Sequence, residues 1–382
     1  MSRLLAWASR LPPGVQTTLK SLPGAAYLRM LAAGTPRLDG PAAGERRAVV
    51  YLPTWVRWDS MRQRPQYLLS AFAKAGHPVY FVDPREGGAR MSDGVHIVAS
   101  LRDVPRSGVL LYVHFAPVRR MFRLFRDPAV VYDILDDLSI YERSEADIPA
   151  RNRVAAHHPN VMDEADVVIA SNEVLAERHG PRRPDLLLVE NGVDVDMFAT
   201  PMSRPTDLPS GPIVGYHGAI APWFDFDLFE AVARSAPDLQ FVLVGPVDPE
   251  AAADTARVDR LENVTVLGEK PSRAMPGYVQ AFDIGAIWFR VDHMTRGVTP
   301  LKMFECLAAG TPCVATPLPA CVEEPSVRTA GGPHEFLGAL REVLEGAETE
   351  TSAEASVDGV SWESRLAPVL SRLEALGLDR VG

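Results

Sequence analysis

The sequence predicts an α/β protein built from two doubly wound, Rossmann-like domains that face each other across a cleft. Three observations support this prediction. The chain has 382 residues, which suits two domains of ordinary size. From Arg47 onward, short apolar runs alternate with helical patterns, as they do in successive βαβ units. A proline-rich stretch over residues 197–212 separates a first series of such units from a second and is typical of a linker.

Each series contains enough strand-like runs for one open sheet. The six or seven runs of the first are Ala48–Leu52, Val79–Val82, Val95–Val98, Val109–His114, Val130–Leu135, Val167–Ala170 and Leu186–Val189. Those of the second are Ile213–Tyr216, Phe241–Val244, Val264–Leu267, Ile284–Phe289 and Cys313–Ala315. The clearest helical patterns of the second series are Phe226–Arg234, Pro300–Ala309 and Glu335–Leu344. In sheets of this kind, ligands bind beyond the carboxyl ends of the strands.

The chain divides into four segments: an extension (1–45), a first domain (46–196), a second domain (197–358) and a C-terminal helix (359–382). The first 38 residues carry five basic side chains and no acidic one. A disordered or domain-packing extension is favoured there, and contact with an anionic membrane surface is the alternative. We expect Pro368 to interrupt the C-terminal helix, which could return to the first domain.

Composition excludes several classes of function. A formal net charge of -10 argues against nucleic acid as the main partner, because nucleic-acid binding requires a basic surface. The three cysteines have neither the number of a disulfide framework nor the spacing of a zinc site, so a reducing cytoplasm fits. No apolar run approaches the ~20 residues that cross a bilayer.

One predicted helix carries the strongest indication of a binding site. Thr299 suits its N-cap, Pro300 its first turn, and Gly310 the residue beyond its end. Lys302 and Glu305 are three residues apart, so they share one face near the positive helix N-terminus. This arrangement would match the phosphate and ribose of a nucleotide. The alternative is an exposed Lys-Glu pair on an ordinary helix.

An ordered set of motifs resembles the GT-B glycosyltransferases of the family 4 type, which take a sugar from a nucleoside diphosphate. In chain order the motifs are Arg64-Pro-Gln-Tyr-Leu-Leu, Ala75-Gly-His-Pro-Val, Ala165-Asp-Val-Val-Ile-Ala-Ser-Asn, Glu190-Asn-Gly-Val-Asp194 with Phe198, Gly215-Tyr-His-Gly218, Val242-Leu-Val-Gly245, and the helix with Ala308-Ala-Gly-Thr-Pro312. The resemblance covers the chain from about Arg47 to the end. The segment from Trp58 to Gln66 looks like a bacterial branch that builds cell-surface polysaccharides or glycosylated natural products.

This resemblance implies roles for individual residues around the donor. Glu305 matches the family glutamate that binds the ribose hydroxyls. Lys302, Arg296 and the helix N-terminus at Thr299 are then available to the diphosphate, together with the loops at Gly218 and Gly245. Arg296 has an alternative as a solvated loop residue.

The first domain is expected to supply the remaining groups. Arg62 or Arg64 would reach the phosphates across the cleft, and Trp58 would border the cleft or the acceptor. His114 takes the position of a family histidine that touches the donor sugar, with a structural role as the alternative. Of the carboxylates Asp133, Asp136 and Asp137, the last two are candidates for acceptor binding or base catalysis, and capping of a turn is the alternative.

Two departures from the family pattern affect the expected chemistry. Gly297 stands where the first family glutamate would contact the transferred sugar. The loop after Gly218 lacks the usual arginine and lysine. A further point concerns the loop over residues 53–63, which contains no histidine. Inverting enzymes of the fold that this sequence resembles commonly use a histidine there as general base. Its absence therefore favours retention of the anomeric configuration over inversion.

The resemblance therefore implies a cytoplasmic, metal-independent hexosyltransferase, either free or resting on the inner membrane face. Its donor would be a nucleoside diphosphate sugar acting as co-substrate, with no further cofactor, and its acceptor a hydroxyl compound of unknown class. A nucleotide-sugar epimerase of the same fold is one alternative. A catalytically silent GT-B binding module is the other.

Overall fold

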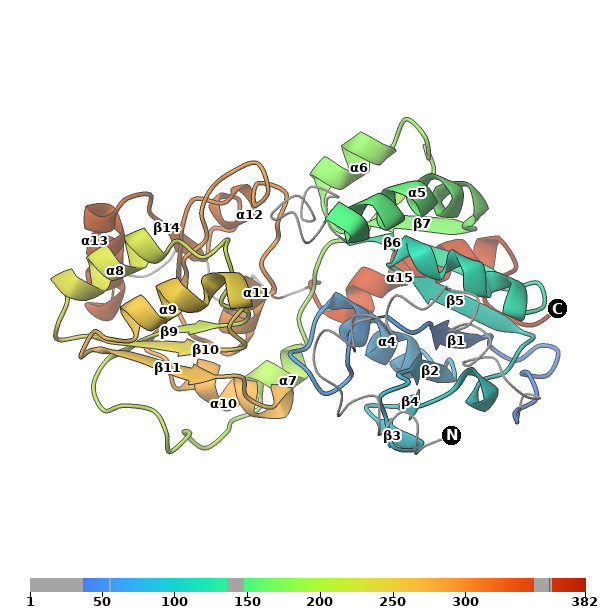
Figure 1. Cartoon of the computed structure of the whole chain (residues 1–382), viewed down its shortest axis with the longest axis horizontal. Helices are drawn as coiled ribbons and strands as arrows, with labels where there is room; N and C mark the ends of the chain where they lie inside the picture. The colour runs from blue at the N-terminus through green and yellow to red at the C-terminus, as the bar shows by residue number, and fades with distance from the viewer. Residues whose placement is uncertain (1–36, 55, 136–147, 347–356, 358) are drawn as a thin grey trace.

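The computed structural model describes residues 37–382 apart from 55, 136–147, 347–356 and 358. The described residues form two lobes, each containing one sheet, and the chain passes between the lobes near α7 and α15 (Figure 1). Most of the basic extension lies outside the described residues, as do Asp136 and Asp137. The predicted fold class is confirmed.

The first domain contains a sheet in the order β3-β4-β2-β1-β5-β6-β7-β8, parallel throughout except for β3. Its strands are β1 (Ala48–Tyr51), β2 (Val79–Val82), β3 (Arg90–Ser92), β4 (Val95–Val98), β5 (Val109–Val113), β6 (Ala129–Ile134), β7 (Val167–Ala170) and β8 (Leu187–Leu188). Its helices are α4 (Arg64–Lys74), α5 (Ile148–Glu164) and α6 (Glu173–His179), with the 3-10 helices η1 (Leu101–Asp103) and η2 (Ala116–Leu124).

The second domain contains a fully parallel sheet in the order β11-β10-β9-β12-β13-β14. Its strands are β9 (Ile213–His217), β10 (Gln240–Val244), β11 (Val264–Gly268), β12 (Ile284–Ile287), β13 (Cys313–Ala315) and β14 (Val327–Thr329). Its helices are α8 (Phe226–Ser235), η4 (Pro249–Ala251), α9 (Ala252–Val258), η5 (Ser272–Ala274), α10 (Met275–Gln280), α11 (Leu301–Ala308), α12 (Pro319–Val322) and α13 (Pro333–Leu344).

Apolar residues on both faces explain why the central strands read as continuous apolar runs. In β5, Leu111 packs into a core shared with α5 and η2, whereas its neighbour Leu110 packs into a second core beneath α4 and α15. Successive side chains of a strand point to opposite faces, so both must be apolar when helices cover both. The carboxyl ends of β5 and β7 lead to His114 and Asn172, which line the space between the two domains.

The strands β3 and β14 were not predicted. Asp93 and Gly94 connect β3 to β4, and both have positive φ values, 52° and 76°. Two such residues form the type I′ turn of a tight hairpin, for which Asp-Gly is a strong sequence signal. The strand itself is three residues long and only partly buried, so its sequence does not form an apolar run that would indicate a strand.

The C-terminal helix α15 (Trp362–Ala375) packs against α4 and β7 of the first domain, where Figure 1 shows it in red. The predicted interruption at Pro368 is wrong, because the helix continues through that residue. Trp362, Leu366, Val369 and Leu373 are buried at helical spacing. The burial of this face outweighs the loss of one backbone hydrogen bond.

Helix α7 (Val195–Ala199) occupies the start of the segment predicted as a linker. The Asp194 side chain caps it by accepting a hydrogen bond from the Met197 backbone amide at 3.1 Å. The irregular connection therefore begins only after this short helix. Where the chain returns, Ser361 forms a parallel bridge with Val193, so the two crossings run side by side.

Candidate functional site

A cavity of about 530 Å³ lies between the two domains. It is bordered by residues that follow strands of both sheets. The predicted site residues that line it are Arg62, Arg64, His114, Gly218, Gly245, Arg296, Thr299, Lys302 and Glu305. The structure thus brings together residues from distant parts of the sequence that were assigned to one donor site.

Helix α11 positions Lys302 and Glu305, although it begins differently from the prediction. Thr299 is not the N-cap; that position belongs to Pro300, and no side chain caps the helix. The Thr299 carbonyl instead accepts a hydrogen bond from the Asn191 side chain at 2.8 Å. The helix N-terminus is therefore tied to the first domain by the residue that the sequence suggested as its cap. Gly310 lies just beyond the helix with a φ of 72°, as predicted.

Lys302 is a half-buried residue whose ammonium lies beside two aromatic rings. Its Nζ lies 4.4 Å from the ring centroid of Phe289 and 4.9 Å from that of Tyr216. Burial lowers the pKa of Lys302 to about 8. Within the described part of the chain, no carboxylate oxygen lies within 4.0 Å of this ammonium. An anion entering the cavity would supply the missing counter-charge.

Two glycine turns keep the backbone close to Lys302. Gly218 and Gly245 have φ values of 118° and 153°, in the region that favours glycine. A Cβ on Gly245 would lie 2.0 Å from the Gly218 carbonyl oxygen, and a Cβ on Gly218 would lie 3.1 Å from Lys302 Cε. Only glycines allow these loops, which follow β9 and β10, to stay in contact with each other and with the lysine.

The Glu305 carboxylate is held by two protein donors from different domains. His217 Nε2 lies 2.8 Å from Oε2, and the Tyr67 hydroxyl donates to Oε1 at 3.1 Å. Glu305 is 8% exposed, so little of the carboxylate remains open to solvent. Both partners also line the cavity.

His114 lies directly after β5 in the wall formed by the first domain. Its Nδ1 is 3.1 Å from the Tyr51 hydroxyl, and its ring stacks on that of Tyr51 at a centroid distance of 5.5 Å. Burial lowers the pKa of His114 to about 4, so the imidazole is neutral near pH 7. The group can exchange hydrogen bonds with a neutral sugar but does not contribute positive charge.

Arg64 was expected to contact the phosphates, and the structure places its guanidinium in a buried ion pair. Its guanidinium is 2% exposed and donates from Nε to Oδ2 of the fully buried Asp133 at 2.8 Å. It also donates to the Glu190 carbonyl and to Asn191 Oδ1. Since Asn191 in turn donates to Thr299, this buried pair supports the contact between the first domain and α11.

Arg62 lines the cavity, whereas Trp58, which lies beside Arg62, does not. Arg62 lines the cavity and forms an ion pair with Asp93, and its guanidinium lies over the rings of Trp58 and Tyr67. Trp58 is 3% exposed and packs on Phe81, so its ring belongs to the core and does not line the cavity. Arg296 lines the cavity from an exposed loop.

Comparisons with known proteins agree with this two-domain arrangement. Residues 211–345 match the family model described as glycosyl transferases group 1. The chain is 30% identical over 197 residues to a Bacillus subtilis (strain 168) protein, provisionally named teichuronic acid biosynthesis glycosyltransferase TuaH. This match covers 48% of the chain and 50% of the relative, so about half of each protein is compared.

Solved structures match nearly the whole chain. The sucrose-phosphate synthase of Thermosynechococcus elongatus superposes with a TM-score of 0.65 at 15% identity, over 87% of this chain and 99% of that one. Anabaena HepE in complex with UDP and glucose superposes with a TM-score of 0.57 at 16% identity, over 85% and 99%. The chain has the GT-B glycosyltransferase fold. At these identities the likeness establishes the fold alone.

In this GT-B protein, the position of the missing family glutamate faces the first domain. A Cβ on Gly297 would lie 3.6 Å from both Asn172 Oδ1 and Val174 Cβ at the start of α6. The side chains nearest to that position are therefore those of another domain. The sequence alone could not reveal this contact.

Three residues of the GT-B cleft were missed by sequence reasoning. Tyr67 and His217 bind Glu305, and Asp93 binds Arg62. The Asp-Gly turn signal would have located Asp93, and the position of His217 at the end of a predicted strand would have placed it at the cleft edge. Nothing in the local sequence distinguishes Tyr67 from an ordinary core tyrosine on α4.

The described residues contain neither a cluster of metal-ligating side chains nor a helix suited to span a membrane. No group of three or more His, Cys, Asp and Glu side chains there is arranged to hold a metal ion. No helix in that part of the GT-B protein has both the length and the apolar character required to cross a bilayer.

Proposed function

We propose that this protein is a glycosyltransferase that moves a sugar from a nucleoside diphosphate sugar to a hydroxyl acceptor with retention of configuration. One observation carries the proposal: Lys302 and Glu305, one turn apart on α11, both line the interdomain cavity next to the glycine turns. A cation and a carboxylate at this separation suit the phosphate and the ribose of one donor molecule. The match of residues 211–345 to the group 1 glycosyl transferases supports the same activity.

In this proposal, the diphosphate lies against Lys302 and the loop at Gly218. The Lys302 ammonium supplies positive charge with no described carboxylate oxygen within 4.0 Å, and the close glycine backbone leaves room for the phosphate oxygens. Glu305 accepts hydrogen bonds from the ribose hydroxyls. Arg296 extends the positive side of the cavity from the exposed loop.

Transfer then proceeds on one face of the sugar. The bond between the anomeric carbon and the donor phosphate oxygen breaks, and the acceptor oxygen bonds to that carbon from the same side. The departing phosphate oxygen takes the acceptor proton, so a separate protein base is not required. The protein's contribution is to position the reactants and to stabilise the diphosphate that leaves. Lys302 and the backbone provide that stabilisation in our proposal, which assigns no metal.

The acceptor side is assigned to the first domain. His114, neutral near pH 7, is placed to hydrogen-bond a sugar hydroxyl from the cavity wall. Asp136 and Asp137 keep their proposed role with the acceptor. The name of the Bacillus subtilis relative favours a cell-surface glycan as the product, and a natural product is the alternative. The free, buried thiols of Cys306, Cys313 and Cys321 suit a cytoplasmic location.

The proposal predicts that one class of nucleotide sugar stabilises the protein and that Glu305 is required. UDP-, GDP- and dTDP-sugars are compared by thermal shift, because a ligand that binds only the folded state raises the melting temperature. Glu305→Gln should weaken binding of the selected nucleotide by about 10- to 100-fold, the value of hydrogen bonds to a charged group. Calorimetry measures the loss.

Glu323→Gln is the matched control, because Glu323 is exposed and does not line the cavity. Binding of no nucleotide, or unchanged binding by Glu305→Gln, would contradict the proposal. Slow donor hydrolysis without acceptor would distinguish an enzyme from a silent binding module. Formation of an epimer under the same conditions would favour the epimerase.

A further inference from the structure

The Glu305 carboxylate already has a hydroxyl donor in the ligand-free protein. The Tyr67 O–H reaches it from α4 of the first domain, and His217 reaches it from β9 of its own domain. The side chain of Glu305 is 11% exposed, so there is little room for a further donor while both partners stay in place. A ribose hydroxyl must therefore share or take over one of these two positions.

We propose that the Tyr67 hydroxyl occupies the position of a ribose hydroxyl on Glu305, so that donor binding exchanges one O–H donor for another. This inference rests on the proposed function, because it requires Glu305 to bind the ribose. The phenol and the ribose hydroxyl are both neutral O–H donors of similar reach. The exchange keeps the buried carboxylate hydrogen-bonded before and after donor binding, which avoids the cost of an unpaired buried charge.

Tyr67 is the partner that leaves, because it belongs to the other domain. Its ring is packed between side chains of its own lobe: it stacks on Trp362 at a centroid distance of 5.2 Å, and the Arg62 guanidinium lies 5.4 Å from its centroid. The phenol oxygen therefore stays beside Glu305 as long as the two domains keep this arrangement. Its withdrawal requires a change in the separation of α4 and α11, whereas His217 moves with Glu305.

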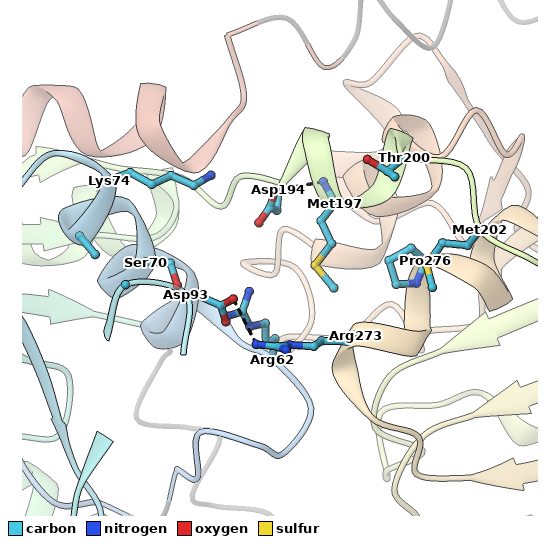
Figure 2. A pocket seen from close by; sticks show the side chains of 12 residues that line it. Arg62, Ser70, Lys74, Asp93, Asp194, Met197, Thr200, Met202, Arg273 and Pro276 are labelled. Atoms are coloured by element: carbon cyan, nitrogen blue, oxygen red, sulfur yellow. Dashed lines mark hydrogen bonds and ion pairs between the residues drawn. The ribbon is translucent and has the colours of Figure 1, made fainter. Parts of the chain in front are cut away.

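A second contact between the domains lies beside Tyr67. Asp93 forms ion pairs with Arg62 of its own domain and, at 3.5 Å, with Arg273 of the second domain. Figure 2 shows these three side chains meeting at the edge of a second cavity of about 570 Å³, which Lys74 and Met197 also line. Because this bridge is separate from Glu305, removal of the Tyr67 hydroxyl alone leaves the domains in contact.

The test compares two probes on Tyr67→Phe, a change that removes the hydroxyl and keeps the stacked ring. UDP carries a ribose, and inorganic pyrophosphate carries only the phosphates. We expect the variant to bind UDP about tenfold more tightly than the wild type, because UDP no longer displaces a hydrogen bond to a charged group. Pyrophosphate affinity should stay within about twofold, since pyrophosphate does not reach Glu305. Calorimetry measures both. Tyr278→Phe is the control, because the Tyr278 hydroxyl binds Asp207.

Other results would overturn the inference. Unchanged or weaker UDP binding by Tyr67→Phe would mean that the hydroxyl does not compete with the ribose. An equal gain for UDP and pyrophosphate would mean that it acts only by holding the domains together. Arg273→Met, which removes the interdomain ion pair with Asp93 and keeps the Arg62–Asp93 pair, provides the reference pattern for that second result. If the wild type binds none of UDP, GDP and dTDP, or if Glu305→Gln binds the selected one normally, the proposed function itself fails.

Discussion

Lys302→Met is expected to weaken binding of the donor nucleotide by about 100-fold, which corresponds to loss of a buried, charge-assisted contact of about 3 kcal/mol. Methionine keeps an apolar stem between Phe289 and Tyr216, so the packing around α11 is preserved. Calorimetry with UDP measures the effect, and thermal unfolding checks the fold. Lys74→Met is the matched control, because Lys74 pairs with Glu363 outside the donor cavity. Binding within threefold of wild type would remove Lys302 from the proposed site.

The same lysine determines the direction of a pH effect. Its pKa of about 8 in the free protein lies below the ordinary value of 10.5, so the ammonium is lost as pH rises through 8. Nucleotide affinity should therefore fall from pH 7.5 to 9, and Lys302→Met should show no such decline. The stability of the free protein changes in the opposite direction, rising as pH increases. The buried charge destabilises the free protein fully below pH 8, and this cost disappears between pH 8 and 10.5.

Asp133→Asn should destabilise the protein by about 3–5 kcal/mol, because it leaves the Arg64 guanidinium buried without its counter-charge. Asp133 is fully buried, and Tyr112 also donates to it at 2.5 Å. Urea unfolding measures the change in the free energy of unfolding. Asp103→Asn removes an exposed ion pair with Arg37 and should cost less than about 1 kcal/mol.

The double variant Arg64→Met with Asp133→Leu separates two contributions to stability, that of the unpaired charge and that of the packing around it. It removes both charges together and should recover much of the lost stability, as expected when a buried pair is replaced by apolar groups. The same double variant loses the contacts of Arg64 with Glu190 and Asn191. A stability of Asp133→Asn equal to that of Asp103→Asn would show that the buried charge of Arg64 is compensated elsewhere.

Most of the fold was predictable because its information is local. Buried central strands such as β2, β4, β7 and β13 have the predicted bounds, since each is an apolar run covered on both faces. The strand β3 escaped because its residues are largely polar and its position depends on a turn. Pro368 misled the prediction of α15, because a buried face can stabilise a helix that local propensity would break.

The candidate site was predictable only where one element carries it. Lys302 and Glu305 share a helix, so their common face followed from spacing. The partners of Glu305 come from β9 and from α4, and the partner of Arg62 comes from the β3–β4 turn. Such pairings depend on how two sheets face each other, which no local pattern encodes. Thr299 illustrates the same limit, because an interdomain bond to its carbonyl accompanies a helix start one residue later than predicted.

The placement of α15 also determines the order in which the lobes can be completed during synthesis. All strands of the second sheet lie within residues 213–329, so that lobe contains its whole sheet in one continuous stretch. The first lobe needs Trp362 and Leu366, which follow every residue of the second, to close the apolar surface over α4. A growing chain can thus finish its second lobe first, and its earlier lobe waits with an uncovered core until the final helix is made.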